Sequence, residues 1–367
     1  MKKPTLSQCI AFLFLLSCTS CGSKEEFIDE IPEEQPEERP EELPEEQPQT
    51  TATFKDAPYL IGCAVVPALL QNNRMYAEVV QEEMSSITPE NALKMGALSR
   101  GRGNYFWDDA DYLMEYAADN QMRVHGHTLI WHTDVPGWVT GFSGTQEEWI
   151  ALMQEYIHEV VGRYQGRITS WDVVNEAFND DGTYRKTIWY ENIGEAYIRL
   201  AFEFAYEADP DALLFYNDYG MEYSTAKREA ICTLVKDLRA EGVPVHGIGL
   251  QMHIDMYRSA SDLQASIQAA ADCGVWVHVS EMDVACNPEK KADFTFTDKI
   301  AQQQKASYQA MSEALLSIPA DQRFGSTFWG VCDAHSWLTS APDAPLPFDS
   351  NFEKKPAYDG LTGTFGK

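Results

Sequence analysis

Short apolar runs rich in β-branched and aromatic residues alternate along this chain with longer segments whose apolar positions recur at helical spacing. The runs predict strands at 60–65, 85–87, 122–129, 168–175, 213–217, 245–251, 275–281 and 325–329. The longer segments predict helices at 147–163, 192–208, 225–240, 263–273 and 298–317. Eight strands alternating with helices over about 310 residues are typical of an α/β protein with a (β/α)₈ barrel.

Two of the predicted helices carry capping-box spacing just before their first turns. Thr145 precedes Glu148, and Ser261 precedes Gln264, so we expect helices to begin beside both pairs. A doubly wound open sheet would give the same alternation of strands and helices. The first predicted strand is not followed by a glycine-rich phosphate loop, however, and the barrel is therefore favoured.

The first 21 residues have the pattern of a bacterial export signal. Lys2 and Lys3 precede an apolar run at 9–16 that is too short to span a bilayer. Cys18 ends a Leu-Leu-Ser-Cys sequence similar to a lipobox, and Cys21 is a second candidate for lipid attachment. We expect a lipid anchor that holds the exported protein at the bacterial outer membrane or cell surface. A plain secretory signal is the alternative.

Residues 22–53 are expected to form a disordered spacer, which leaves 54–367 for the barrel. Proline recurs every fourth position from Pro32 to Pro48, so a helix is excluded there. Residues 24–53 carry twelve acidic and two basic side chains, a net charge of −10 that extends the chain by self-repulsion.

The overall charge narrows the choice of partners. The chain has 28 basic and 57 acidic residues, so nucleic acid is a poor candidate. Nine Trp and seventeen Tyr suit a sugar-binding cleft, but they also suit any large core. We interpret the five barrel cysteines mainly as small buried hydrophobes, with at most one or two disulfides, and we expect a monomer.

Candidate catalytic residues lie at the ends of two apolar strands. The stretch WDVVNEAF at 171–178 delivers Asn175 and Glu176, and the stretch VWVHVSEMD at 275–283 delivers Glu281. A carboxylate at the end of an apolar strand is costly to bury unless it is used. Strand ends of one barrel converge across a cleft, and paired carboxylates there are the equipment of a glycoside hydrolase.

Other strand ends supply hydrogen-bonding groups and tryptophans, the mixture that sugars require. They are Glu90, Asn91, Lys94, His127, Trp131, Asn217, Asp218, Tyr219, Gln251, His253, Asp283, Trp329 and Trp337. His125 and His127 share one strand face and form a possible metal pair. Metal sites of this type need further His and Asp ligands, whereas the fourth and seventh strands offer glutamates. We therefore expect neither a metal nor a cofactor.

These motifs closely resemble those of glycoside hydrolase family 10, whose members are mainly endo-β-1,4-xylanases with a (β/α)₈ fold. The matching segments are TPEN at 88–91 with Lys94, GHTLIWH at 126–132, WDVVNEAF at 171–178, QMH at 251–253, EMD at 281–283, TFWG at 327–330, and Asp333 with Ser336 and Trp337. The resemblance covers roughly residues 55–365, with the motifs in family order at barrel-strand spacing.

The resemblance implies a retaining reaction on xylan. Glu281 matches the nucleophile and Glu176 the acid/base, while Asn175 matches the amide that bonds the 2-hydroxyl of the cleaved sugar. His253 resembles the imidazole that orients Glu281, with Asp283 behind it. The positions lining the non-reducing-side subsites match Glu90, Asn91, Lys94, His127, Trp131, Gln251, Trp329 and Trp337. Tyr219 matches an aromatic near the leaving-group side.

Some positions depart from the family pattern. They are Met84 and Ser85, Met95, His125 and Asp134. None of them is a catalytic glutamate, so they bear on the affinity of subsites. Two alternatives stay open, namely a preference for β-1,4-glucan within the same family, and a catalytically silent glycan-binding lipoprotein. Retention of both glutamates and of Asn175 argues against the silent protein.

Overall fold

The structure, a computed structural model, describes residues 52–366. Eight parallel strands pair in the order β1-β2-β5-β6-β7-β8-β10-β11, and β11 pairs with both β1 and β10, which closes the barrel. The strands are β1 Ile61–Val65, β2 Ser86–Pro89, β5 Arg123–Gly126, β6 Ser170–Asn175, β7 Leu213–Asp218, β8 Gly247–Leu250, β10 Trp276–Ala285 and β11 Arg323–Phe328. The short strand β9 (His253–Asp255) pairs in parallel with the last residues of β10.

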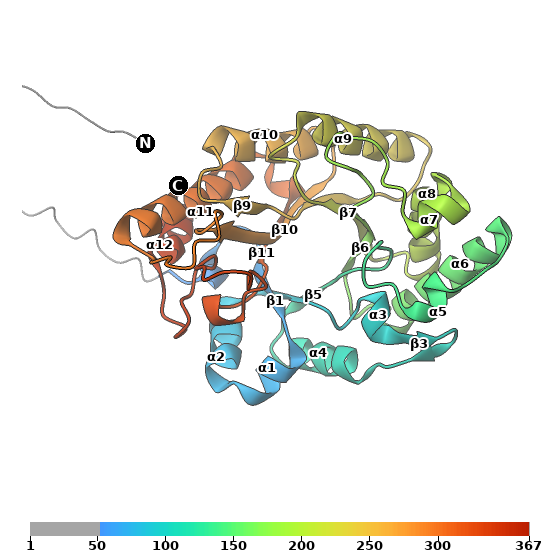
Figure 1. Cartoon of the computed structure of the whole chain (residues 1–367), viewed down its shortest axis with the longest axis horizontal. Coiled ribbons are helices and arrows are strands. Elements are labelled where there is room, and N and C mark those ends of the chain that lie inside the picture. The colour runs from blue at the N-terminus through green and yellow to red at the C-terminus, as the bar shows by residue number, and fades with distance from the viewer. Residues whose placement is uncertain (1–51, 367) are drawn as a thin grey trace, which may run out of the picture. The chain divides into compact units, whose positions relative to one another are not determined.

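Helices surround the strands, with α9 and α10 at the top of Figure 1 and α11 and α12 at the left. The helices are α1 Pro67–Asn72, α2 Arg74–Glu83, α3 Met95–Leu98, α4 Asp108–Asp119, α5 Gly137–Thr140, α6 Gln146–Arg163, α7 Ile188–Ile193, α8 Ala196–Ala208, α9 Thr225–Ala240, α10 Ala260–Ala271, α11 Asp298–Ser317 and α12 Pro356–Thr362. A hairpin of β3 (Ser99–Gly101) and β4 (Asn104–Tyr105) follows α3.

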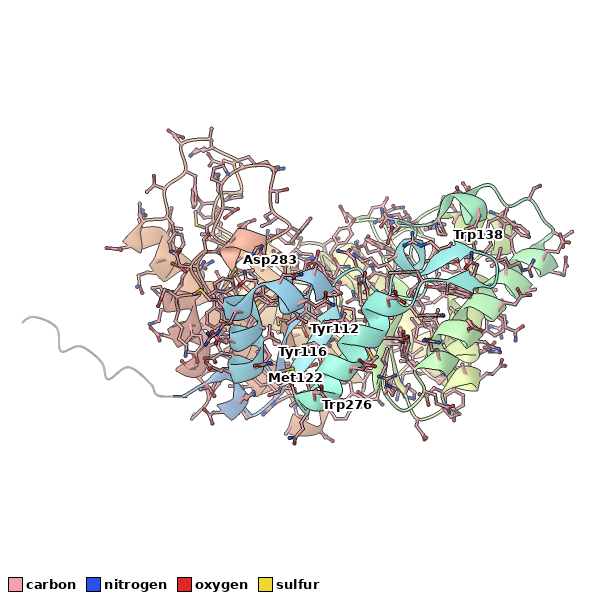
Figure 2. The ribbon with its side chains drawn as sticks, turned by 90° about the horizontal axis from the view of Figure 1, so that it is seen from below. Tyr112, Tyr116, Met122, Trp138, Trp276 and Asp283 are labelled. Carbon is pink, nitrogen blue, oxygen red and sulfur yellow. The ribbon has the colours of Figure 1, made fainter. Side chains whose placement is uncertain are left out.

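All eight barrel strands run toward the same face. In Figure 2, Trp276 at the start of β10 lies low and Asp283 near its end lies high. Met122, just before β5, lies low, and Trp138, on the helix that follows β5, lies high. The carboxyl ends of the strands therefore meet at the upper face of this view, where barrel enzymes carry their active sites.

The barrel strands are buried on both faces, as parallel strands covered by helices should be. Every residue of β1 and of β6 is buried. Trp171 of β6 lies where Gly126 of β5 has no side chain, and a Cβ at Gly126 would overlap the indole ring. His125 contacts rings of β7, β10 and β11 across the barrel, and side chains alternate along a strand, so the contact of Gly126 with Trp171 lies on the outer face that the helices cover.

The predicted fold is confirmed, and each predicted strand corresponds to a strand of the barrel. The strand predicted at 122–129 is too long, because β5 ends at Gly126. The chain beyond it stays beside β6, where an isolated parallel bridge pairs Ile130 with Val174. The helix predicted at 192–208 is two helices, since Gly194 adopts a φ of 86° between α7 and α8.

The two predicted helix starts have different outcomes. The capping box of Thr145 and Glu148 is present at the start of α6. The second is wrong: α10 begins earlier, and Ser259 rather than Ser261 caps it by accepting a hydrogen bond from the Asp262 N–H at 3.2 Å.

The predicted signal at 1–21, with Cys18 and Cys21, and most of the predicted spacer lie outside the described residues. Within 52–366, Phe54 is fully buried and its N–H donates to the Glu83 carboxylate at 3.1 Å. No helix of this part of the chain is long and apolar enough to cross a membrane. Its five cysteines are buried and free.

Candidate active site

One cavity of about 520 Å³ opens at the carboxyl ends of the barrel strands. It brings together both predicted catalytic glutamates and every side chain that the family resemblance assigns to sugar binding, whereas the strand-end residues Asn217, Asp218 and Asp283 do not line it. The predicted residues that line it are Glu90, Asn91, Lys94, His127, Trp131, Asn175, Glu176, Tyr219, Gln251, His253, Glu281, Trp329 and Trp337. Gly220 and Tyr223 also line it and were not predicted.

Glu281 is the more deeply buried of the two glutamates, with 5% of its side chain exposed. Its Oε1 accepts a hydrogen bond from Asn217 Nδ2 at 2.7 Å, and its Oε2 lies 3.3 Å from His253 Nε2. Asn217 is fixed in turn, because Ser280 Oγ donates to its Oδ1 at 2.6 Å. The carboxylate is therefore held in one orientation at the wall of the cavity.

The charge on Glu281 is favoured by its neighbours. Burial alone would raise the pKa of this carboxyl, but the electrostatic effect of nearby His127 and the hydrogen bond from His253 outweigh it and lower the pKa. Burial would likewise lower the pKa of His253, yet Asp283 and Glu281 raise it to about 10. His253 is thus an imidazolium at neutral pH, and Glu281 is ionised.

Asp283 lies behind this pair and does not line the cavity. It accepts hydrogen bonds from His253 Nδ1 at 3.0 Å and from the indole N–H of Trp337 at 2.6 Å. Half of Trp337 is exposed. Asp283 therefore links His253, which contacts Glu281, to Trp337, which lines the cavity.

Glu176 has a different environment. Its side chain is 12% exposed, its Oε1 accepts from Gln251 Nε2 at 3.0 Å, and its Oε2 lies 4.0 Å from His132 Nε2. The backbone of Glu176 has a φ of 58°, a left-handed conformation that is unfavourable for a residue with a side chain. Its N–H donates to the Asn217 carbonyl at 2.9 Å, which anchors this turn to β7.

Asn175 points its amide into the same network. Its Oδ1 accepts from Asn217 Nδ2 at 2.9 Å and from Gln251 Nε2 at 3.2 Å, and its Nδ2 donates to Glu176 Oε1 at 3.3 Å. Rotating the amide would let the oxygen accept from Trp131 Nε1 at 3.2 Å, but it would place the nitrogen against the Asn217 Nδ2 donor. Since Ser280 and Glu281 fix Asn217, we retain the first orientation.

A second side of the cavity combines indole faces with a polar chain. Lys94 Nζ lies 5.1 Å from the centre of the Trp131 ring and 5.9 Å from that of Trp329. The ammonium donates to Asn91 Oδ1 at 2.9 Å, and Asn91 Nδ2 donates to Glu90 Oε1 at 3.0 Å. Such a surface offers hydrogen bonds to sugar hydroxyls and apolar faces to sugar C–H groups.

His125 and His127 lie on either side of a carboxylate. His125 Nε2 is 3.0 Å from Asp172 Oδ1, and His127 Nδ1 is 2.9 Å from Asp172 Oδ2. Burial would raise the pKa of Asp172, but the two imidazoles lower it well below its usual range. Within residues 52–366, no group of three or more His, Cys, Asp or Glu side chains is arranged to hold a metal ion.

Several residues that shape the site were not predicted as site residues. Asn217 was predicted only as a residue at a strand end. Its amide donates to the Glu281 carboxylate, and its backbone carbonyl accepts from the Glu176 N–H. Arg185 comes from the loop after β6, where its Nε donates to the Glu176 carbonyl at 3.1 Å. Lys227 comes from α9 and contacts Asp218. Neither cation lies in a strand-end motif, so no local pattern pointed to it.

Two carboxylates at opposed strand ends of a parallel barrel, within a cavity walled by tryptophans, define the chain as a glycoside hydrolase. The sequence profile of Glycosyl hydrolase family 10 matches residues 50–363, and the chain belongs to this family.

Relatives and solved structures agree with this assignment. The chain is 37% identical over 294 residues to "Endo-1,4-beta-xylanase B" of Thermotoga neapolitana, covering 79% of this chain and 83% of the relative. It is 39% identical over 293 residues to "Beta-1,4-xylanase" of Dictyoglomus thermophilum, covering 77% and 82%. The crystal structure of xylanase 10B from Thermotoga petrophila RKU-1 in complex with xylobiose is similar with a TM-score of 0.80 and 34% identity, covering 86% of this chain and 98% of that one.

Proposed function

We propose that this protein is an endo-β-1,4-xylanase that cleaves internal bonds of xylan with retention of configuration. The observation that carries the proposal is the pair of glutamates with opposite surroundings in one cavity. Glu281 is deeply buried and held as an anion, whereas the side chain of Glu176 is more exposed. The xylanase names of the relatives above support xylan as the substrate.

In the first step, Glu281 attacks the anomeric carbon while Glu176 donates its proton to the leaving glycosidic oxygen. A covalent glycosyl-enzyme forms and the reducing-side fragment departs. The hydrogen bond from Asn217 and the imidazolium of His253 keep Glu281 ionised and correctly oriented for this attack. Asn175, beside Glu176, is placed to bond the 2-hydroxyl of the cleaved sugar.

In the second step, Glu176 is a carboxylate and takes a proton from a water molecule that attacks the anomeric carbon. The bond to Glu281 breaks, and Glu281 returns to its ionised form. Because each step inverts the anomeric carbon, the product retains the original configuration. In a retaining enzyme the two carboxyl groups lie about 5–5.5 Å apart. We predict this distance between the carboxyl groups of Glu176 and Glu281.

Product analysis on three polymers tests the substrate. We expect xylan and arabinoxylan to give a ladder of xylo-oligosaccharides from internal cleavage, with little release of sugar from carboxymethylcellulose. A β-1,4-glucan preference is the competing proposal, since "Exoglucanase XynX" of Acetivibrio thermocellus is 35% identical to this chain, which spans 29% of that relative. Faster cleavage of carboxymethylcellulose than of xylan would favour the glucanase.

We also propose that the enzyme is an exported monomer attached to the bacterial outer membrane or cell surface by lipid on Cys18 or Cys21. The lipobox-like sequence and the acidic spacer support this proposal. The spacer would separate the barrel from the membrane and let the cavity reach an insoluble polymer.

A further inference from the structure

Lys227 of α9 is fully buried although it carries an ammonium group. Its Nζ lies 3.0 Å from Asp218 Oδ1, 3.4 Å from Asp180 Oδ1 and 3.4 Å from the centre of the Tyr219 ring. Burying a charge is costly unless it is paired. The ammonium is therefore tied to these three partners, which come from the β6 and β7 ends of the barrel.

The contact with Asp218 leads to the backbone of Glu176. Asp218 Oδ2 accepts a hydrogen bond from the Tyr216 hydroxyl at 2.6 Å, and that hydroxyl accepts from the Ala177 N–H at 3.0 Å. Ala177 directly follows Glu176, whose backbone is held in the left-handed conformation. A buried carboxylate thus anchors the peptide that carries the acid/base.

Lys227 favours the ionised form of Asp218. Burial raises the pKa of Asp218 to about 6, although Lys227 acts in the opposite direction. Without the ammonium, Asp218 would take up a proton more readily. Its hydrogen bond with Tyr216 would then lose the strength that an ionised acceptor gives it.

The contact with Tyr219 leads to Glu176 by a second route. Lys227 packs against the face of the Tyr219 ring, and Arg185 Nη2 donates to the Tyr219 hydroxyl at 2.8 Å. The Nε of the same arginine donates to the Glu176 carbonyl. Tyr219 lines the cavity, so one buried cation fixes both the acid/base turn and an aromatic wall beside it.

We propose that Lys227 is a positioning residue for proton transfer by Glu176, acting through Asp218 and Tyr219 and never touching the substrate. The inference rests on the roles proposed above for Glu176 and Glu281. Glu281 takes its hydrogen bonds from Asn217 and His253, which are different side chains. Loss of Lys227 should therefore weaken leaving-group protonation far more than nucleophilic attack.

The test compares substrates that differ in their need for an acid. In Lys227→Met, we expect kcat/KM on xylohexaose to fall on the order of 100-fold, because general acid catalysis contributes at least that much. On 2,4-dinitrophenyl β-xylobioside, whose leaving group needs little protonation, the loss should stay below about threefold. Lys236→Met, an exposed position on the same helix, is the control and should match wild type on both substrates.

A second variant covers the case in which Lys227→Met does not fold. Tyr216→Phe removes only the hydroxyl that links Asp218 to Ala177, and it should give the same substrate split with a smaller loss. Equal losses on both substrates in a folded variant, or no loss on either, would overturn the inference. A wild-type enzyme inactive on xylohexaose would instead contradict the proposed function.

Discussion

At the scale of single residues, Glu281 is held by a chain of hydrogen-bonded and charged side chains rather than by a single contact. Trp337 and His253 both donate to Asp283, and His253 faces Glu281. Asp283 contributes most to the raised pKa of His253, and the resulting imidazolium helps to lower the pKa of Glu281. The positive charge that faces the nucleophile at neutral pH therefore depends on a residue outside the cavity.

The Asp283→Asn variant tests this chain of contacts. Without the anion, His253 loses its proton at a lower pH, and above that pH Glu281 has lost its cationic partner. The alkaline limb of kcat/KM against pH, measured with an aryl xylobioside, should therefore move downward by roughly one pH unit. Asp298→Asn, an exposed change at the start of α11, should leave the limb in place. An unmoved limb in Asp283→Asn would remove Asp283 from the account.

The same groups set the pH window of stability. The folded-state pKa of His253 is raised above its ordinary 6.5, so its contribution is fully present below that pH and is lost as pH rises toward 10. The pKa of Glu281 is lowered, so its contribution is present above 4.5 and is lost as pH falls through the lower folded-state value. The melting temperature should fall at both extremes, and Asp283→Asn should flatten the alkaline side.

At the scale of elements, glycines in one strand make room for the working side chains of the next. In β8, Gly249 has no Cβ, and the Asn217 side chain of β7 lies in that space. Asn217 cannot move away freely because Ser280 and Glu281 hold its amide. A small residue on one strand thus determines the orientation of the nucleophile on another.

Gly249→Ala should therefore damage activity more than stability. The added methyl group overlaps the Asn217 oxygen and displaces the hydrogen bond to Glu281, so kcat should fall at least about tenfold. Gly162→Ala in α6 is the matched control, since nothing lies within 4 Å of its Cβ. The control should keep full activity and gain a few tenths of a kcal/mol or more in unfolding free energy. Normal kcat in Gly249→Ala would show that Asn217 is dispensable.

The sequence predicted every strand of the barrel, but it did not predict where several strands and helices begin and end. The apolar runs identified every barrel strand because both faces of these strands are buried. The division at Gly194 and the cap at Ser259 depend on backbone conformation, which the hydrophobic pattern does not encode. Helix α4 was missed although its buried residues Ala110, Leu113, Met114 and Ala117 form one stripe at helical spacing, so its signal was present in the sequence.

The candidate site was predictable wherever its residues end a strand, since parallel strands bring those ends together. Lys227 and Arg185 were not predictable by this reasoning. Lys227 reaches the site from a helix and Arg185 from a loop. Partners distant in sequence help to fix both, Asp180 for Lys227 and Tyr219 for Arg185. Their placement follows from tertiary packing and carries no local signature.

At the scale of the whole molecule, we expect the N-terminal segment to determine location without affecting catalysis. The native protein should fractionate with membranes, and replacing both Cys18 and Cys21 by Ala should release it or block its processing. Each single replacement shows which cysteine carries the lipid. A double variant that stayed membrane-bound would place the anchor elsewhere.

Deleting residues 24–50 should leave melting temperature and activity on soluble xylan nearly unchanged. The deletion stops before Ala52 because its carbonyl accepts from the Tyr358 hydroxyl at 3.2 Å, and before the buried Phe54. A deletion that extends through Phe54 should lower the melting temperature, because it removes a fully buried aromatic side chain. Equal effects of the two deletions would contradict this boundary.

The central claim assigns different roles to the two glutamates, and azide rescue tests it most directly. Glu281→Ala should lose activity on every substrate by on the order of 10⁴-fold or more, with no β-configured product on adding azide. Glu176→Ala should still form the glycosyl-enzyme from an aryl xylobioside with a good leaving group, and then stall. Azide needs no general base, so it should restore turnover of this variant and yield the β-xylobiosyl azide through two inversions. An α-azide from Glu176→Ala, or equal collapse of both variants without rescue, would contradict the assignment.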